Sequence, residues 1–277
     1  MGHLQATGVD AAGRKQYLYH ERWRVHRDRQ KFERMLQFGA QLPRLRRRVA
    51  AELRGNEADR SRVTACAVRL LDLGMFRIGS EEYADRNGGL GLTTIGKRHV
   101  TISGKSIEFD YLGKGGARRV QGIDDPASAA VVAALKSRRG GGAQLLAYRD
   151  GRRWKDLRAE EVNEFLKQAL GEEFSAKDFR TWNATVMAAV TVAAEGEHAR
   201  SQNSRRQYVR RAIAAVAELL GNTPAVARRS YIDPRVFDLY LSGSTIAPAL
   251  ERIGELDVSD SRVRNRVEKA VLELLTG

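Results

Sequence analysis

Cysteine is almost absent from this sequence, whose 277 residues include a single one, Cys66. One thiol cannot build a disulfide framework, so the fold must rest on other interactions. Cys66 shares a helical spacing with Val63, Ala67 and Leu70. This pattern is typical of a small buried hydrophobe and gives no support to a catalytic thiol. We therefore expect a reducing compartment.

Long apolar runs are also missing, and no stretch is long enough to cross a bilayer. No charged and then apolar leader precedes a cleavage site, so we expect a cytoplasmic location beside the nucleoid and no membrane partner. The five histidines have no metal-ligand spacing. The glycine run at residues 113–116 lacks the order of a phosphate-binding loop. We therefore expect neither a metal, nor ATP, nor another cofactor.

Acidic residues are scarce relative to basic ones. Lys and Arg total 48 against 34 Asp and Glu, which gives a formal net charge of +14 and a pI of about 10.2. Such an excess favours a polyanionic partner, and double-stranded DNA is the first expectation. A basic surface that binds no particular partner is the alternative that charge alone leaves open.

The first residues alternate as a β-hairpin does. Residues 3–8 and 14–19 flank residues 10–13, which carry a turn signal. In the second run, Lys15 and two tyrosines share one face of the predicted strand. A basic and aromatic strand of this kind fits a nucleic-acid groove. Because an isolated hairpin is marginal in water, we expect another part of a larger structure to cover it.

Two helices are predicted next, from residue 28 to about 53 and from about 59 to 75. The second leads directly into Phe76-Arg77-Ile78-Gly79. Arg77 is thus flanked by apolar residues just after a buried helix, where a charge is costly unless it is paired. We expect Arg77 to meet an anion or a carboxylate.

The period of the sequence then changes from helix to strand. Four runs predict strands, at residues 92–95, 99–102, 107–112 and 118–123. Turns that contain glycine separate the last three runs, which predicts an antiparallel meander of three or four strands. Lys114 stands between glycines at a hairpin tip, where its side chain can reach outward.

From Asp125 onward the pattern is almost entirely helical. Residues 175–195 begin with a sequence similar to a capping box, which places Arg180 in the first turn of a helix. A positive charge at that end opposes the helix dipole, so a bound anion would explain it. The predicted class is therefore α+β and mainly α, with a helical domain that carries a small antiparallel three-stranded sheet and is preceded by the β-hairpin.

Helix-end signals surround Tyr231. Gly221 is typical of a helix C-cap, and Thr223-Pro224 of an N-cap followed by the first helical residue. Asp233-Pro234 repeats that signal, so Tyr231 falls at a junction between helices with two arginines beside it. Tyr231 is therefore a candidate for a nucleophile that faces a phosphate.

The order of these residues resembles that of the type IB DNA topoisomerases, specifically their small poxvirus and bacterial branch. The motifs that carry the resemblance are Gly13-Arg14-Lys15-Gln16-Tyr17-Leu18-Tyr19, Phe76-Arg77-Ile78-Gly79, Tyr111-Leu112-Gly113-Lys114, Lys177-Asp178-Phe179-Arg180-Thr181-Trp182 and Ser230-Tyr231. The resemblance implies single-strand cleavage through a 3′-phosphotyrosyl intermediate, strand rotation and religation, without ATP or metal. It also implies a monomer with no obligate protein partner. Residues 1–27 are then expected to be the remnant of an N-terminal DNA clamp, and residues 28–277 the catalytic domain.

The resemblance also implies a role for each site residue. Tyr231 is expected to be the nucleophile and Lys114 the general acid. The residues expected to hold the phosphate are Arg77, Arg180 and Asn222. The residues expected to contact DNA outside the reacting phosphate are Arg14, Lys15, Gln16, Tyr17, Tyr19 and Lys177.

Two alternatives stay open from the sequence. A tyrosine site-specific recombinase shares this chemistry, but it usually has a histidine three residues before the second arginine, where this chain has Lys177. If the chain were a non-catalytic DNA-binding module, the match of four residues to the topoisomerase motifs would be a coincidence. These residues are Arg77, Lys114, Arg180 and Tyr231. The chain also departs from many topoisomerase relatives, in which a histidine stands at the position of Asn222. Asparagine can donate the same hydrogen bond but carries no charge.

Overall fold

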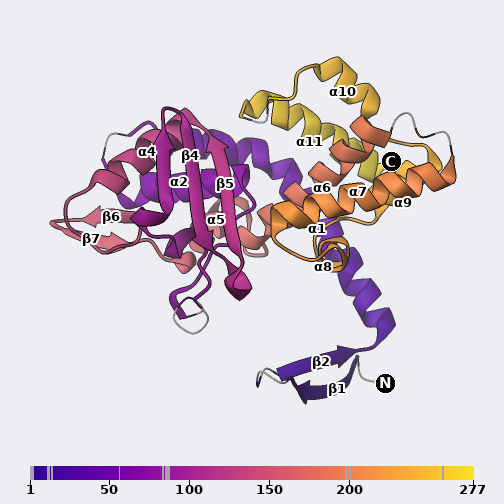
Figure 1. The fold of residues 1–277 in the computed structure, drawn as a ribbon, viewed down its shortest axis with the longest axis horizontal. Coiled ribbons are helices and arrows are strands. Elements are labelled where there is room, and N and C mark those ends of the chain that lie inside the picture. Colours follow the sequence, from indigo (N-terminus) through magenta and orange to yellow (C-terminus); the bar gives the residue numbers. More distant parts are fainter. Residues whose placement is uncertain are drawn as a thin grey trace. The chain divides into compact units, whose positions relative to one another are not determined.

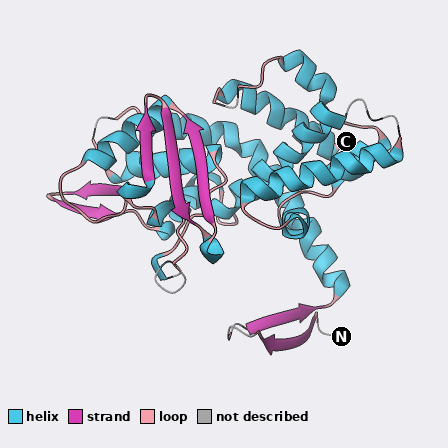
Figure 2. Ribbon diagram, in the orientation of Figure 1, coloured by secondary structure: helices cyan, strands magenta, loops and turns pink. Residues whose placement is uncertain are grey.

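The structure of the chain is a computed structural model that describes residues 3–10, 13, 15–55, 57–82, 84, 88–196, 199, 201–257 and 259–277. It divides into two compact units, Met1–Gln37 and Phe38–Gly277. The described strands form small antiparallel sheets, and most other residues are helical (Figure 2). The predicted class, α+β and mainly α, is confirmed. The functional boundary expected after residue 27 stays a prediction.

The first unit contains the predicted hairpin. Strands β1 (Leu4–Val9) and β2 (Lys15–Tyr19) pair in antiparallel fashion. The Lys15 ammonium lies 5.6 Å from the centre of the Tyr17 ring, and the Tyr17 and Tyr19 rings stack with their centroids 6.2 Å apart. The hairpin therefore presents one basic and aromatic face, as the alternation predicted.

Helix α1 (Glu21–Glu52) begins well before the predicted start at Asp28. The ring of His20 caps it, since the His20 Nδ1 accepts a hydrogen bond from the Arg22 amide at 3.2 Å. The His20 carbonyl oxygen also accepts from the Trp23 amide at 3.0 Å. The predicted start was wrong because a histidine fills the role that sequence rules give to Ser, Thr, Asp and Asn.

The second unit has a sheet-bearing half followed by a helical half (Figure 1). After the end of α1, the first half consists of α2 (Arg60–Leu73), the 3-10 helices η1 (Leu92–Thr94) and η2 (Lys97–His99), β3 (Val100–Ser103), β4 (Ser106–Leu112), the 3-10 helix η3 (Lys114–Gly116), β5 (Arg118–Asp124), α4 (Pro126–Ser137), β6 (Ala147–Asp150), β7 (Arg153–Asp156) and α5 (Ala159–Leu170). The second half consists of α6 (Ala176–Gly196), α7 (Gln202–Leu220), α8 (Pro224–Ser230), α9 (Arg235–Ser242), α10 (Ala247–Ile253) and α11 (Ser261–Thr276). Figure 1 shows α2 and α4 behind the sheet, and α6 and α7 side by side.

Strands β3, β4 and β5 form the predicted antiparallel meander. The alternate residues Ile107, Phe109 and Tyr111 of β4 are buried on one face of the sheet. Phe76 is 1% exposed, and its ring meets the Phe109 ring edge-on at a centroid distance of 4.9 Å. The sheet thus anchors the backbone immediately before Arg77.

Residues 92–95 do not form the predicted fourth strand, because they turn into η1. The Thr94 hydroxyl accepts a hydrogen bond from the Gly91 amide at 2.9 Å, which closes the turn. The Leu92 amide donates to the Arg77 carbonyl oxygen at 2.8 Å. This amide supports the backbone of Arg77 and does not pair with the sheet, which is why the strand prediction was wrong.

The chain after Asp125 is not as uniformly helical as predicted. Strands β6 and β7 form a hairpin in which Arg149 lies opposite Trp154. Gly151 at its turn has a φ of 58°, which favours glycine. Asp150-Gly151 is a known hairpin signal, so this hairpin had a local signature that the helical interpretation missed.

Helix α2 is buried along most of its length. Val63, Cys66, Leu70 and Leu71 are at most 1% exposed. Burial raises the pKa of the Cys66 thiol to about 12, so the thiol is neutral at physiological pH, as expected of a small buried hydrophobe. None of the described helices is both long enough and apolar enough to span a membrane.

The predicted helix ends at Gly221 and Thr223 are confirmed, whereas α9 begins at Arg235 with Pro234 as its N-cap, one residue later than predicted. Gly221 follows α7 in the left-handed conformation, with φ 60° and ψ 49°. The Thr223 hydroxyl caps α8 by accepting a backbone N–H at 3.3 Å. The Asp233 carboxylate accepts another at 3.0 Å at the start of α9. These caps place Tyr231 between two short helices.

A buried network of charges joins α1, α2 and α11. Arg46 is 6% exposed and donates to the Asp72 carboxylate at 2.8 Å and to the Glu268 carboxylate at 2.7 Å. Arg264 donates to Asp72 as well, at 2.7 Å. Burial by itself would raise the pKa of Asp72, but the charges of Arg264 and Arg46 outweigh it and hold that pKa well below its usual range. Removing one partner would leave a buried charge without compensation.

We predict that Asp72→Asn lowers the free energy of unfolding by about 3–5 kcal/mol, because Arg46 and Arg264 both lose the carboxylate that they share in a buried network. Asp110→Asn is the matched control, since its partner Arg118 is 70% exposed. The control should cost less than about 1 kcal/mol. Urea unfolding at neutral pH measures both variants, and equal losses would contradict the importance of the network.

The stability difference between the parent and Asp72→Asn should also depend on pH. A carboxylate whose pKa is lowered by folding stabilises the folded state above its unfolded pKa of about 3.9. That contribution disappears as the pH falls toward the lowered folded pKa. The gap between the parent and the variant should therefore narrow in acid.

Candidate active site

Tyr231 is held where α8 ends. Its backbone N–H donates to the Ala227 carbonyl oxygen at 3.0 Å, and the next residue, Ile232, is fully buried. The Tyr231 carbonyl oxygen lies 3.3 Å from the hydroxyl of Thr185 on α6, which in turn accepts the Asp233 amide at 3.1 Å. The backbone is thus fixed on both sides of a half-buried phenol.

Arg180 lies beside Tyr231 in the first turn of α6. It is 4% exposed, and its guanidinium carbon lies 5.2 Å from the centre of the Tyr231 ring. Its two terminal nitrogens donate to the carbonyl oxygens of Met75 and, at 2.8 Å, of Leu220. No carboxylate among the described residues pairs with this guanidinium, and its Nε has no hydrogen-bond partner there. Backbone carbonyl dipoles and the Tyr231 phenol therefore compensate the charge of Arg180 in the described part of the chain.

Arg77 connects Tyr231 with Asn222. One terminal nitrogen of Arg77 lies 3.4 Å from the Tyr231 hydroxyl, and the other donates to the Asn222 Oδ1 at 2.8 Å. Because a guanidinium has only donors, the amide oxygen of Asn222 faces it and the amide nitrogen does not. In the described part of the chain, that nitrogen is buried and has no hydrogen-bond partner. A buried donor beside two guanidiniums is suited to an anionic oxygen.

This cluster of Arg77, Arg180, Asn222 and Tyr231 favours negative charge. Burial by itself would raise the pKa of the Tyr231 phenol, but the charge of Arg180 and the hydrogen bond and charge of Arg77 lower it. Burial and then the charge of Arg77 lower the pKa of Arg180 to about 10. Two positive groups that crowd each other without a carboxylate form a site for an anion.

Two predicted site residues of the second unit, Lys114 and Lys177, lie outside this cluster. Lys114 is exposed in η3, at the tip of the β4–β5 hairpin, as predicted. The hairpin tip is ordered by the Gly113 amide, which donates to the Ala117 carbonyl oxygen at 2.8 Å. Lys177 is exposed in the first turn of α6. Both lysines therefore lie exposed at the surface of the second unit.

The predicted DNA contacts of the hairpin lie in the first unit. The four that the structure describes are Lys15, Gln16, Tyr17 and Tyr19. The first three are exposed and Tyr19 is partly buried. The Gln16 amide donates to the Asp10 carboxylate at 2.9 Å. Arg14 lies outside the described residues, so its part in the hairpin stays a prediction.

Two residues that the sequence analysis did not single out support the cluster. Thr185 holds the backbone around Tyr231, as described above. Arg119 on β5 donates to the carbonyl oxygens of Glu218, at 2.9 Å, and of Leu219. Strand alternation places Arg119 on the buried face of the sheet, opposite Tyr111. A charged residue on that face was the sequence signal that could have identified Arg119.

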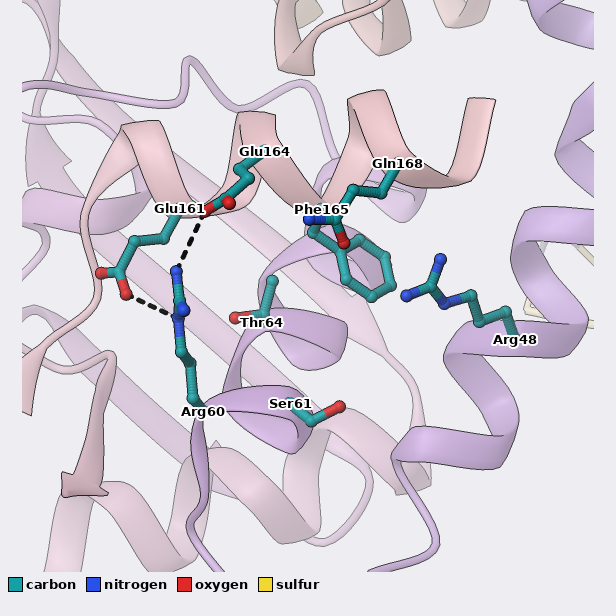
Figure 3. Close-up of a pocket in the computed structure, with 8 residues that line it drawn as sticks. All are labelled: Arg48, Arg60, Ser61, Thr64, Glu161, Glu164, Phe165 and Gln168. Atoms are coloured by element: carbon teal, nitrogen blue, oxygen red, sulfur yellow. Dashed lines mark hydrogen bonds and ion pairs between the residues drawn. The ribbon is translucent and has the colours of Figure 1, made fainter. Parts of the chain in front are cut away.

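A cleft of about 300 Å³ lies elsewhere on the second unit, between α1, α2 and α5 (Figure 3). In it Arg60 pairs with Glu161 at 2.8 Å and with Glu164 at 3.1 Å. Arg48 lies 4.4 Å from the centre of the Phe165 ring. The carboxylates in this cleft offset its arginines, so it does not share the anion-binding character of the cluster. Within the described ranges, no three His, Cys, Asp or Glu side chains gather as metal ligands would.

The sequence of this chain is similar to those of known proteins. Residues 20–239 match the family model described as the catalytic core of eukaryotic DNA topoisomerase I. The chain is also similar to DNA topoisomerase 1B of Acanthamoeba polyphaga mimivirus, with 27% identity over 245 residues, which cover 86% of this chain and 72% of that protein. The span matched to the family includes every residue of the cluster and Lys114.

We predict that the Tyr231 phenol ionises below the usual tyrosine pKa of about 10, because positive neighbours lower its pKa. The difference between ultraviolet titrations of the parent and of Tyr231→Phe isolates this phenol. Tyr111→Phe is the matched control, since burial raises the pKa of Tyr111 although the same arginines lie near it. A Tyr231 midpoint at or above that of Tyr111 would show that the arginines do not favour tyrosinate.

Proposed function

Because this chain belongs to the family of DNA topoisomerase I catalytic cores, we propose that its cluster breaks and rejoins one strand of DNA. The chain is thus a DNA-binding enzyme with the function of a type IB DNA topoisomerase. The observation that carries the assignment of the site is the Arg77 guanidinium, which reaches both the Tyr231 hydroxyl and the Asn222 amide. A nucleophile and phosphate-binding donors thereby meet at one point.

Tyr231 is the nucleophile. Its phenolate oxygen attacks the phosphorus of a phosphodiester, so an oxygen–phosphorus bond forms and the bond from phosphorus to the 5′ oxygen breaks. At an ordinary tyrosine pKa roughly one phenol in a thousand is ionised at neutral pH, and the lowered pKa of Tyr231 increases that fraction. The 3′-phosphotyrosyl product conserves the energy of the phosphodiester. The 5′ hydroxyl can therefore attack in reverse and rejoin the strand without ATP.

Arg77, Arg180 and Asn222 stabilise the phosphate during attack. Negative charge builds up on its non-bridging oxygens, and a donor already in place there contributes on the order of 3 kcal/mol. The Nε of Arg180 and the amide nitrogen of Asn222 are buried donors without partners in the described chain, which supports this role. The terminal nitrogens of Arg180 already bind two carbonyl oxygens. Arg180 therefore acts on the phosphate chiefly through its positive charge and its Nε donor.

Lys114 is the general acid. It donates its proton to the 5′ oxygen as that oxygen leaves, and its exposed position at a hairpin tip supports such a reach. Because all of the reacting groups lie on one chain, a monomer suffices for the chemistry.

Lys177 and the hairpin hold the DNA around the reacting phosphate. Lysine contacts phosphates and fixes the position of the duplex, whereas glutamine and tyrosine side chains suit base edges. The hairpin residues assigned to these contacts are Arg14, Lys15, Gln16, Tyr17 and Tyr19. The basic and aromatic face of β2 supports the assignment.

We predict that the chain relaxes supercoiled plasmid in EDTA without ATP and that Tyr231→Phe does not. The variant lacks the attacking oxygen, so it should form no denaturant-resistant adduct with DNA. It should bind DNA as the parent does, because charged groups dominate affinity. Gel assays of relaxation and of adducts measure both forms.

The same assays separate the alternatives. A parent that forms adducts but never relaxes plasmid would favour a tyrosine recombinase. Binding with neither adducts nor relaxation would favour a non-catalytic DNA-binding module. Adducts formed by Tyr231→Phe would mean that another residue is the nucleophile.

We predict that Lys114→Ala slows cleavage by about a hundredfold or more, because a general acid is lost. A substrate with sulfur at the 5′ bridging position has a better leaving group, so it should restore the rate. Lys105→Ala, which changes another exposed hairpin lysine, is the control and should cleave both substrates at the parent rate. If the sulfur substrate is slowed as much as the oxygen substrate, Lys114 is a phosphate contact and not the acid.

A further inference from the structure

The side chain of Arg119 joins two parts of the site that are far apart in sequence. Arg119 belongs to β5, the strand that follows the turn of Lys114. Its guanidinium donates to the carbonyl oxygens of Glu218, at 2.9 Å, and of Leu219. These carbonyls lie in the last turn of α7, just before Asn222. One side chain thus links the hairpin of the general acid to the helix that ends at a phosphate donor.

Two glycines make room for this side chain. A Cβ at Gly113 would lie 3.0 Å from the Cγ of Arg119, and a Cβ at Gly221 would lie 2.7 Å from one of its terminal nitrogens. Gly113 directly precedes Lys114, and Gly221 directly precedes Asn222. The stem of Arg119 therefore packs on the backbone before the acid, and its head packs on the backbone before the phosphate donor.

The contact also changes the charge at the end of α7. The carbonyl end of a helix carries a partial negative charge of about half an electron, which disfavours a nearby phosphate. Here guanidinium groups bind the last three carbonyl oxygens of α7. Arg119 binds those of Glu218 and Leu219, and Arg180 binds that of Leu220. The two arginines thus turn a negative helix end into a positive border of the site.

We propose that Arg119 is a positioning residue for strand cleavage, which fixes Asn222 and Lys114 relative to each other without touching DNA. The proposal rests on the cleavage chemistry proposed above. Its terminal nitrogens bind the carbonyl oxygens of Glu218 and Leu219, and its guanidinium also hydrogen-bonds the phenol of the neighbouring Tyr111, so its partners lie within the protein. Arg118 provides a natural comparison, because it lies on the opposite face of β5, is 70% exposed and pairs with Asp110 at 2.6 Å.

The test measures the single-turnover rate of adduct formation in Arg119→Met, which keeps the stem and loses the donors. We expect a loss of about ten- to a hundredfold, the size that small misplacements of reacting groups produce. DNA affinity and its dependence on salt should stay at the parent values. Arg118→Met, the control, should cleave at the parent rate.

A double-mutant cycle distinguishes positioning from a general loss of structure. If Arg119 acts through Asn222, then Arg119→Met should slow Asn222→Ala much less than it slows the parent. Additive effects would overturn the proposal, as would a parent-like rate in Arg119→Met. A weaker salt dependence of DNA binding would mean that Arg119 contacts phosphate directly and would overturn it too.

Two further controls keep these outcomes interpretable. If the parent chain forms no adduct, the proposed function fails, and that result is distinct from a failure of Arg119→Met alone. If thermal unfolding shows that Arg119→Met is not folded, Arg119→Lys replaces it in the same cycle. Lysine keeps the charge and can still bind one carbonyl oxygen, so it should recover part of the lost rate.

Discussion

The site depends on the burial of one guanidinium without a carboxylate. A buried charge must be compensated, and Arg180 finds its partners in the carbonyl oxygens of Met75 and Leu220. Those carbonyls stand just before the motif of Arg77 and the turn of Asn222. When the two segments fold onto Arg180, they also bring Arg77 to the hydroxyl of Tyr231 and Asn222 to Arg77. The requirement to solvate one charge with backbone dipoles thus assembles groups from distant parts of the chain.

A second buried arginine, Arg46, shows by comparison that burying Arg180 without a carboxylate partner is electrostatically unfavourable. Arg46 is as inaccessible as Arg180, but it binds Asp72 and Glu268, and these partners raise its pKa in spite of burial. Burial and Arg77 lower the pKa of Arg180 to about 10. Arg46, which pairs with carboxylates, stabilises the fold, whereas Arg180, which has no carboxylate partner among the described residues, leaves a positive potential that a phosphate can satisfy. Binding of DNA should therefore relieve an unfavourable charge that folding creates.

Sequence signals located the site where they were local. Gly221 and Thr223-Pro224 predicted the helix ends that precede Tyr231. The position of Arg180 in the first turn of a helix indicated a bound anion. Local sequence rules failed where a residue distant in sequence determined the backbone conformation of a segment. The amides around Leu92 bind the segment of Arg77 and so form no strand. Arg119 binds carbonyls about 100 residues away, a contact that no periodicity reveals.

Asn222 shows how the cluster can work without a titratable group at the position where the family resemblance led us to expect histidine. A neutral imidazole offers one acceptor and one donor nitrogen. Asn222 also offers an acceptor and a donor, with its oxygen toward Arg77 and its amide nitrogen without a hydrogen-bond partner among the described residues. Histidine gains a positive charge when the pH falls below about 6.5, whereas the amide does not change. A third cation would be repelled here, because Arg77 already lowers the pKa of Arg180. Asparagine therefore keeps the hydrogen-bond pattern and gives up only a charge that the two arginines disfavour.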